Sequence, residues 1–156
     1  MGVKIRPVGP DDRESWKTLR LRSLRDSPEA FGSTYEREAE YAAEDWAKWF
    51  DTPMVLAWRD GVPVAMGAGY ADREGWLQVV AMWTAPEARG EGLARLVLDE
   101  LVAWADAHDH RVHLCIALTN PVARKVYEDY GFIPTGEVLT YDGRDGMQVE
   151  RMTLPR

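Results

Sequence analysis

The segment from residue 82 to residue 95 carries most of the information in this chain, and it reads Met82-Trp83-Thr84-Ala85-Pro86-Glu87-Ala88-Arg89-Gly90-Glu91-Gly92-Leu93-Ala94-Arg95. The apolar run before it predicts a strand that ends near Trp83. Apolar residues then recur at helical spacing, which predicts a helix over 93–108. The chain therefore contains a strand, a glycine-containing loop and a long helix in direct succession.

The loop Arg89-Gly90-Glu91-Gly92-Leu93-Ala94 is suited to bind an anion. N–H groups at the start of a helix have no partner within the helix and carry a partial positive charge. Gly90 and Gly92 let the backbone approach a ligand closely, and Ala94 is small for the same reason. Arg89 and Arg95 add positive charge. The Gly-Lys-Ser/Thr of a P-loop and the third glycine of the dinucleotide fingerprint are both missing. The segment by itself is therefore either a diphosphate site of another kind or a plain β-to-α turn.

The remaining elements predict one α/β domain over residues 1–156. Strands are predicted at 3–7, 54–59, 62–70, 76–83, 112–118, 132–139 and 147–154, with turns at Asp60-Gly61, Glu74-Gly75 and Asp142-Gly143. Helices are predicted from Asp11 or Asp12 to Ser27-Pro28, and at 43–50, 93–108 and 121–130, while 29–42 is ambiguous. The order β-α-α-β-β-β-α-β-α-β-β predicts a mixed, mostly antiparallel central sheet flanked by helices.

A second motif follows the predicted strand at 112–118, and it reads Asn120-Pro121-Val122-Ala123-Arg124-Lys125-Val126-Tyr127-Glu128-Asp129-Tyr130-Gly131-Phe132. Asparagine is a preferred residue at helix N-caps, so Asn120 can cap a helix, and Pro121 suits the first helical position. Tyr127 lies two turns later, so both side chains can face one cleft. A phenol can donate a proton to a leaving thiolate. The alternative is that Asn120 only caps the helix and Tyr127 only packs.

Together the two motifs resemble the GNAT superfamily of acyl-CoA N-acetyltransferases. The family pattern Arg/Gln-x-x-Gly-x-Gly/Ala is met by Arg89, Gly92 and Ala94. The later family pattern, Asn-x-x-Ala-x-x-x-Tyr-x-x-x-Gly-Phe, is met by Asn120, Ala123, Tyr127, Gly131 and Phe132. The order of the predicted elements also fits this family, so the resemblance covers nearly the whole chain.

The resemblance implies acetyl-CoA as co-substrate, a primary amine as acceptor, and no metal. Backbone amides of the glycine loop would hold the pyrophosphate, and Met82 and Thr84 would offer backbone groups to the pantetheine and the acetyl carbonyl. Asn120 would contact the pantetheine or orient the amine, and Tyr127 would protonate the departing sulfur. The cofactor-binding residues implied are Met82, Trp83, Thr84, Arg89, Gly90, Glu91, Gly92, Leu93, Ala94, Arg95, Asn120 and Tyr127.

The general base stays open. Many relatives carry a glutamate on the strand before the loop, but residues 76–83 contain no carboxylate, and Gln78 cannot act as a base. Glu74, at the preceding turn, is the nearest acid on that side, and it is the candidate we assign to the catalytic set. Glu36, Glu38 and a chain of water molecules are alternatives.

The acceptor is a small amine or an aminoacyl compound in our first hypothesis. A protein N-terminus or lysine is the alternative within the family, and a sensor that binds acyl-CoA without turnover is the alternative outside enzymes. The segment 31–50 places aromatic side chains among acids, which would suit a cationic amine. The alternative is a pair of helices that packs its aromatic side chains inward.

Composition sets the remaining expectations. A net charge of −7 argues against binding to nucleic acid. The chain has no signal peptide by sequence and no apolar stretch long enough to span a membrane, so we expect a cytoplasmic protein. The single cysteine, Cys115, suits a reducing compartment and is expected to be a buried small hydrophobe. Family analogy suggests a homodimer.

Overall fold

The structure is a computed structural model that describes residues 2–140 and 146–155. Its centre is a seven-stranded sheet in the order β1-β2-β3-β4-β5-β7-β6. Neighbouring strands are antiparallel except β4 and β5, which are parallel. The strands are β1 (Val3–Pro7), β2 (Met54–Arg59), β3 (Val62–Arg73), β4 (Trp76–Thr84), β5 (Arg111–Ala117), β6 (Ile133–Thr140) and β7 (Gln148–Leu154).

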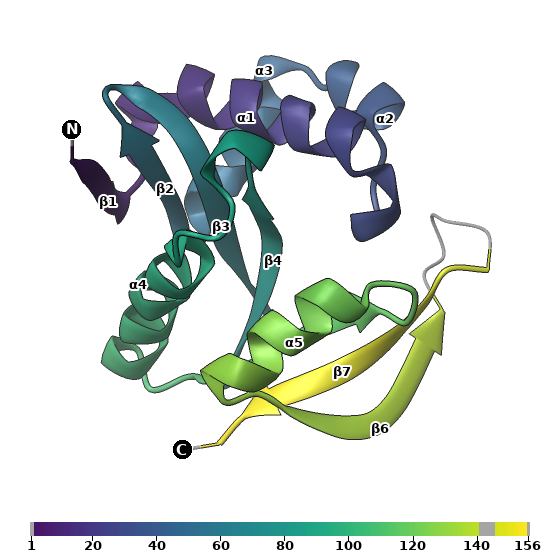
Figure 1. Cartoon of the computed structure of the whole chain (residues 1–156). Helices are drawn as coiled ribbons and strands as arrows, with labels where there is room; N and C mark the ends of the chain where they lie inside the picture. Colours follow the sequence, from purple (N-terminus) through teal and green to yellow (C-terminus); the bar gives the residue numbers. More distant parts are fainter. Residues whose placement is uncertain (1, 141–145, 156) are drawn as a thin grey trace.

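Helices cover both faces of this sheet (Figure 1). One face carries α1 with the short helices that follow it, and the other carries α4 and α5. The α-helices are α1 (Arg13–Asp26), α2 (Tyr35–Ala39), α3 (Ala43–Ala47), α4 (Leu93–Ala107) and α5 (Pro121–Tyr130). The described residues contain no helix that is long and apolar enough to cross a membrane.

The central helix α4 lies unusually close to β3. Its apolar stripe is fully buried against the sheet and consists of Leu93, Val97, Leu98, Leu101 and Ala105. A Cβ atom on Gly67 would come within 2.5 Å of the Met82 sulfur and 2.7 Å of Val97 Cγ1. Only glycine fits this contact, which fixes the depth at which the helix sits and therefore the place where its N-terminus opens.

A β-bulge interrupts β4 near the centre of the sheet. Met66 pairs with Trp83 but Ala68 pairs with Val80, so β4 has one extra residue there, and Ala81 takes a positive φ of 58°. A bulge of this kind leaves a residue unpaired and bends its strand. The pairing of β4 with β5 accordingly ends at the pair Val79–Leu114. Beyond that pair the two parallel strands diverge, and a gap opens between them.

The predicted mixed α/β fold is confirmed, with differences in detail. Strand β3 continues three residues further than predicted, to Arg73, and the ambiguous segment contains the short helix α2, which was not predicted. The predicted helix at 43–50 is α3 followed by a 3-10 turn. Asp12 occupies the N-cap of α1 without a side-chain cap bond, because its carboxylate accepts from the Gly9 N–H and pairs with Arg6. The predicted Asp142-Gly143 turn lies outside the described residues.

Candidate active site

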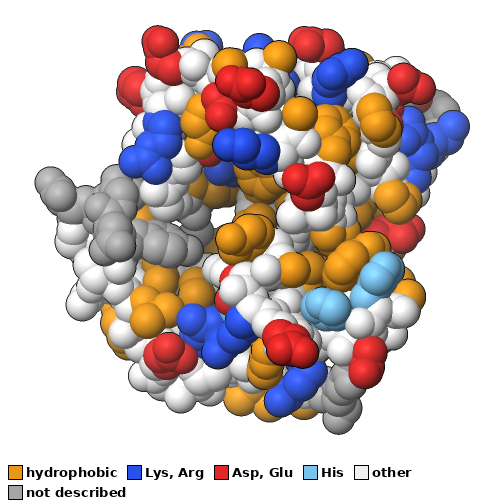
Figure 2. All heavy atoms as spheres, turned by 180° about the vertical axis from the view of Figure 1, so that it is seen from behind, with side chains coloured by type: hydrophobic (Ala, Val, Ile, Leu, Met, Phe, Trp, Pro, Cys, Tyr) orange, Lys and Arg blue, Asp and Glu red, His pale blue; other side chains and the backbone are white. Residues whose placement is uncertain are grey.

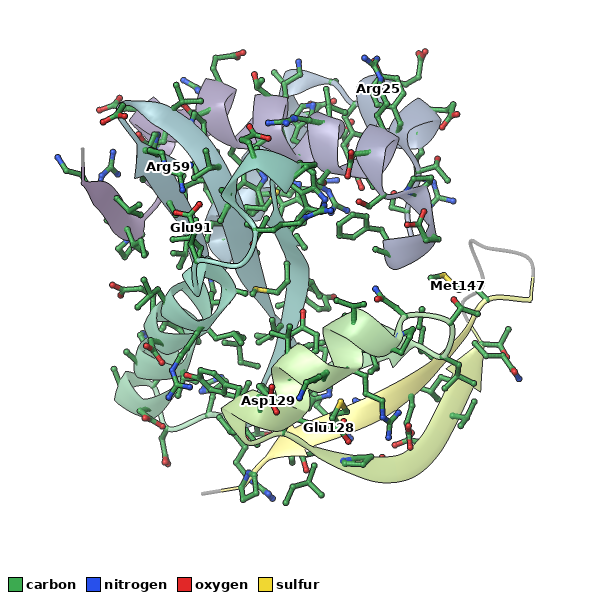
Figure 3. All side chains as sticks on the ribbon, in the orientation of Figure 1. Arg25, Arg59, Glu91, Glu128, Asp129 and Met147 are labelled. Carbon is green, nitrogen blue, oxygen red and sulfur yellow. The ribbon has the colours of Figure 1, made fainter. Side chains whose placement is uncertain are left out.

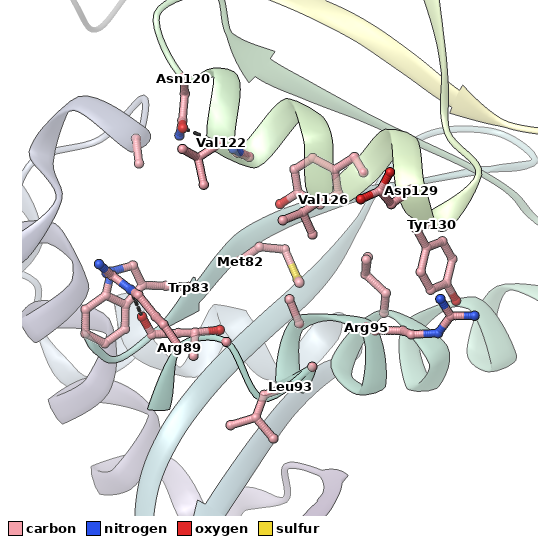
Figure 4. Close-up of a pocket in the computed structure, with 18 of the residues that line it drawn as sticks. Met82, Trp83, Arg89, Leu93, Arg95, Asn120, Val122, Val126, Asp129 and Tyr130 are labelled. Carbon is pink, nitrogen blue, oxygen red and sulfur yellow. Dashed lines mark hydrogen bonds between the residues drawn. The ribbon is translucent and has the colours of Figure 1, made fainter. Parts of the chain in front are cut away.

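Two cavities meet at the gap between β4 and β5. The first, of about 650 Å³, lies between the start of α4 and the inner face of α5, as Figure 4 shows. The second, of about 350 Å³, lies on the side of α1 and α2. Figure 2 shows the molecule hollowed near its centre when it is seen from behind. Both cavities are lined by the same five residues at their junction, namely Ala30, Met82, Asn120, Ala123 and Tyr127.

The start of α4 forms an open cradle of N–H groups in the first cavity. Gly92 is the N-cap with φ 78°, and Gly90 has φ 80°. The first hydrogen bond of the helix runs from the Leu96 N–H to the Gly92 carbonyl at 3.3 Å, so the N–H groups before it remain available to a ligand. No atom lies within 4 Å of a Cβ built on either glycine. The cradle therefore has both the donors and the free space that a diphosphate needs.

Ion pairs hold this loop in place from outside the cavity. The Arg89 side chain donates to the Thr84 carbonyl at 2.9 Å (Figure 4). It also pairs with Asp26 of α1 at 3.3 Å. Glu91 pairs with Arg59 of β2, and the two side chains point toward each other in Figure 3. Glu91 does not line the cavity, and Arg89 is partly committed to the protein itself. Both side chains therefore act chiefly by positioning the loop.

A further pair ties the loop to α1. Arg22 donates two hydrogen bonds to Glu87, at 2.9 and 2.7 Å, and this guanidinium lowers the pKa of the Glu87 carboxyl to about 2. The Trp83 indole N–H donates to the Ser27 hydroxyl at 3.0 Å, so its side chain faces α1. Trp83 can offer only its backbone to a ligand between the strands. The loop is thus braced against the helix that also borders the cavities.

Asn120 and Tyr127 stand where the cavities join. The Asn120 side-chain oxygen accepts from the Ala123 N–H at 3.2 Å, which confirms Asn120 as the cap of α5. Its amide NH₂ has no partner among residues 2–140 and 146–155. The Tyr127 ring packs edge-on to Phe132 at 5.9 Å, and its hydroxyl is likewise unpaired within the described chain. Burial raises the pKa of Tyr127, so the phenol stays protonated at neutral pH.

The backbone of β4 beyond the bulge faces the gap. Residues 80–84 have no ladder partner on the β5 side, and an unpaired strand edge is a template for another extended chain. Met82 lines both cavities, whereas Thr84 lines only the first, and its carbonyl already accepts from Arg89. An extended ligand with amide groups can therefore lie along this edge.

A model of the acetyltransferase (GNAT) family matches residues 16–132. The chain belongs to the GNAT family of acetyltransferases. Among curated proteins it is 32% identical to the mycothiol acetyltransferase of Nocardiopsis dassonvillei, over 83% of this chain and 42% of that protein. The chain thus spans less than half the length of this relative.

Solved structures share the fold. An N-acetyltransferase from Staphylococcus aureus Mu50 aligns with TM-score 0.80 and 16% identity, over 99% of this chain and 98% of that one. The protein yncA from Salmonella typhimurium, solved with its cofactor acetyl-CoA, aligns with TM-score 0.80 and 15% identity, over 99% and 94%. A ribosomal-protein-alanine N-acetyltransferase from Brucella melitensis aligns with TM-score 0.78 and 20% identity, over 96% and 98%. At these identities the likeness is one of fold.

The candidate bases of this GNAT chain lie in different places. Glu74 is exposed on the β3–β4 hairpin, at the end of β4 opposite the bulge, and it lines neither cavity. Glu36 is exposed on α2 and also lies outside both cavities. Glu38 is buried and engaged by Arg20. Gln78 does line the second cavity. The structure therefore brings Asn120 and Tyr127 together but not Glu74.

Of the aromatic side chains in residues 31–50, Phe31 lines the second cavity and the others line neither cavity. Trp49 packs on Trp16 with ring centroids 5.2 Å apart, and Tyr41 packs on Trp46 at 5.5 Å. None of these four rings lines a cavity. The inward-packing alternative is the one observed. The expected wall for a cationic amine is thus not formed, because these rings complete the core under α1.

Sequence reasoning missed three residues of the second cavity, Arg20, Arg37 and Cys115. Arg20 had a detectable signal, because it lies on the face of α1 that otherwise carries Trp16 and Leu24, and an arginine on an apolar face indicates a buried partner. Cys115 is half-buried in the cavity rather than fully buried in the core, and burial raises the pKa of its thiol. No local signal identifies Arg37.

Proposed function

We propose that this protein transfers an acetyl group from acetyl-CoA to a primary amine by direct attack in a ternary complex. The observation that carries the proposal is the pair of cavities joined at Tyr127, with an N–H cradle at the far end of one of them. One cavity suits an elongated, anionic co-substrate and the other a small acceptor. An acyl transfer at the junction needs a proton donor for the leaving group, a fixed donor for the oxyanion and a proton acceptor for the attacking amine.

The residues present fit acetyl-CoA. The positive φ of Gly90 and Gly92, and the open space above them, leave a cradle that any Cβ would begin to fill. The N–H groups of Leu93, Ala94 and Arg95 would hold the pyrophosphate, and the β4 edge at Met82 would hold the pantetheine. When bound, acetyl-CoA supplies an activated thioester.

The chain's own groups then have separate tasks. Tyr127 holds a proton at its hydroxyl and donates it to the departing sulfur. A backbone N–H near Met82 stabilises the negative charge that develops on the carbonyl oxygen. Asn120 directs its free amide NH₂ toward the junction and helps orient the reactants. The gap itself holds the two reactants in line, which removes much of the entropic cost of their encounter.

No aspartate or glutamate lines the second cavity in the described part of the chain, so the walls of this cavity supply no carboxylate base. We therefore propose that a water molecule removes the proton from the attacking amine, and that Glu74 takes no direct part. The cytoplasmic location expected from the sequence belongs to the same proposal. A homodimer stays a prediction, and the edge strand β6 leaves Ile133 and Val138 exposed where a second copy could pack.

The test is release of free CoA from acetyl-CoA with a panel of amines, for the wild type and for Tyr127→Phe. We expect the variant to lower kcat about 100-fold while acetyl-CoA affinity is unchanged, because the phenol acts on the leaving group. Tyr70→Phe, at an exposed site on β3, is the matched control. An unaltered kcat in Tyr127→Phe would remove Tyr127 from the acid role.

The pH profile adds a second check. Because burial raises the pKa of Tyr127, the phenol does not ionise below its ordinary value of about 10. The rate should rise with pH as the acceptor amine loses its proton, and it should not fall again below about pH 10 through ionisation of Tyr127. Tight binding of acetyl-CoA without CoA release for any amine would contradict the enzymatic function itself.

A further inference from the structure

The second cavity carries positive charge. Two arginines line it, Arg20 and Arg37, and none of its lining residues is an aspartate or glutamate in the described chain. The other lining side chains are apolar or neutral. The nearby acids Glu36 and Glu40 lie on the exposed side of α2 and outside both cavities, whereas Glu29 borders the first cavity. The charged side chains that line this cavity are therefore basic, although the protein as a whole is acidic.

Arg20 is a buried guanidinium with one donor unused. Its side chain is only 6% exposed. Its Nε and one terminal nitrogen donate to the two Glu38 oxygens at 2.9 Å each, and its plane lies over the Phe31 ring at 4.9 Å. The remaining nitrogen, Nη1, is buried and has no partner within residues 2–140 and 146–155. A buried donor is normally satisfied, so Nη1 requires an acceptor from outside the described chain, either a water molecule or a ligand.

Arg37 brings a second positive charge to the cavity. It is exposed on α2, one residue before Glu38, and the Thr34 hydroxyl accepts from its backbone N–H at 3.1 Å, which fixes the start of this short helix. Its guanidinium forms no ion pair in the described part of the chain. Since the Arg20–Glu38 pair is internally neutral, Arg37 supplies the net positive charge of the cavity.

The position of the cavity decides what that charge recognises. An acceptor must present its amine at the junction with Asn120 and Tyr127, and the rest of it must then occupy the second cavity. A volume of about 350 Å³ is at the small end of the range for ligand sites. Guanidinium groups hold carboxylate and phosphate groups through paired, charge-assisted hydrogen bonds.

We infer that the acceptor is a small primary amine that also carries an anionic group, with Arg37 as its specificity residue and Arg20 Nη1 as a supporting donor. This inference rests on the proposed acetyl transfer and narrows it. An α-amino acid carries both groups, since its amine and carboxylate are attached to one carbon. A phosphorylated amine shares the same chemistry.

The experiment compares matched acceptors in the CoA-release assay. The pairs are leucine with leucinamide and phosphoethanolamine with ethanolamine, and putrescine represents cationic amines. The enzymes are the wild type, Arg37→Gln, Arg37→Glu and the control Arg13→Gln, which alters an exposed arginine of α1 that lines neither cavity. The amines of a pair differ in pKa, but that difference cancels when the ratio of kcat/KM values is compared between enzyme variants.

We expect Arg37→Gln to lower the ratio of anionic to neutral acceptor about 10- to 100-fold, the range for a charge-assisted hydrogen bond. Arg37→Glu should lower it further, Arg13→Gln should leave it unchanged, and the KM for acetyl-CoA should stay constant throughout. The leucine and phosphoethanolamine pairs show which anion is preferred.

Two results overturn the inference. If neutral or cationic amines are acetylated and Arg37→Gln leaves the ratio unchanged, the anionic acceptor is wrong while acetyl transfer stands. If acetyl-CoA binds but no amine of the panel releases CoA, the proposed function fails and the inference fails with it.

Discussion

Replacement of Gly92 tests the anion cradle most directly. Gly92 has φ 78°, where a residue with a Cβ is strained by roughly 1–2 kcal/mol. No neighbouring atom lies within 4 Å of a Cβ at this position, so Ala fits sterically and its cost is backbone strain alone. We therefore expect Gly92→Ala to lower the free energy of unfolding by about 1 kcal/mol and to weaken acetyl-CoA binding only modestly.

Gly92→Glu adds a negative charge beside the site we assign to the pyrophosphate. For unit charges about 5 Å apart at an effective dielectric constant of about 20, the repulsion is about 3 kcal/mol. This corresponds to a loss of affinity of about two orders of magnitude. Gly92→Gln has nearly the same size and the same strain without the charge, so the difference between the two variants isolates the electrostatic part.

The assay is calorimetric titration with acetyl-CoA at low and at high salt, with unfolding curves to verify that each variant is folded. The difference between Gly92→Glu and Gly92→Gln should shrink as salt is added, because the site is exposed and screening acts over about 8 Å at physiological ionic strength. Equal affinities for Gly92→Glu and Gly92→Ala at low salt would refute the assignment of this helix start to the pyrophosphate.

Two further predictions concern stability. Gly67→Ala should lower the free energy of unfolding in urea by about 1–3 kcal/mol, because its Cβ would meet the Met82 sulfur and Val97. The control is Gly9→Ala, whose Cβ would meet nothing closer than Asp12 at 4.0 Å. Equal urea midpoints for the two variants would show that α4 can move away from β3. Burial lowers the pKa of His113 in the folded state. As the pH drops through the unfolded pKa of about 6.5, the unfolded chain binds more protons than the folded one, and the free energy of unfolding decreases. His113→Gln should therefore show a smaller loss of urea midpoint between pH 7.5 and 5.5 than the wild type, and an identical loss would assign the pH dependence to other groups.

Much of the fold was predictable because its signals are local. The apolar stripe of α4, the cap at Asn120 and the stop at Gly131 are properties of short segments, and each element formed as expected. The short helix α2 was not predictable, because five residues carry too little periodicity and its position depends on the Arg20–Glu38 pair. Glu74 was chosen because it is near β4 in sequence, but its hairpin lies at the start of β4, whereas the junction lies at Met82 near the end of that strand.

The sequence by itself determined the family, the glycine loop at the start of α4 and the placement of Asn120 and Tyr127 on one helix. These features depend on backbone conformation and on spacing along one chain segment, which residue types control directly. Only the tertiary structure decided what lines the second cavity, which we propose for the acceptor, because its walls come from α1, α2, β4 and β5, which are distant in sequence. Its net charge comes from Arg37, Arg20 adds the donor that Glu38 leaves unused, and the packing of those elements alone brings these groups together.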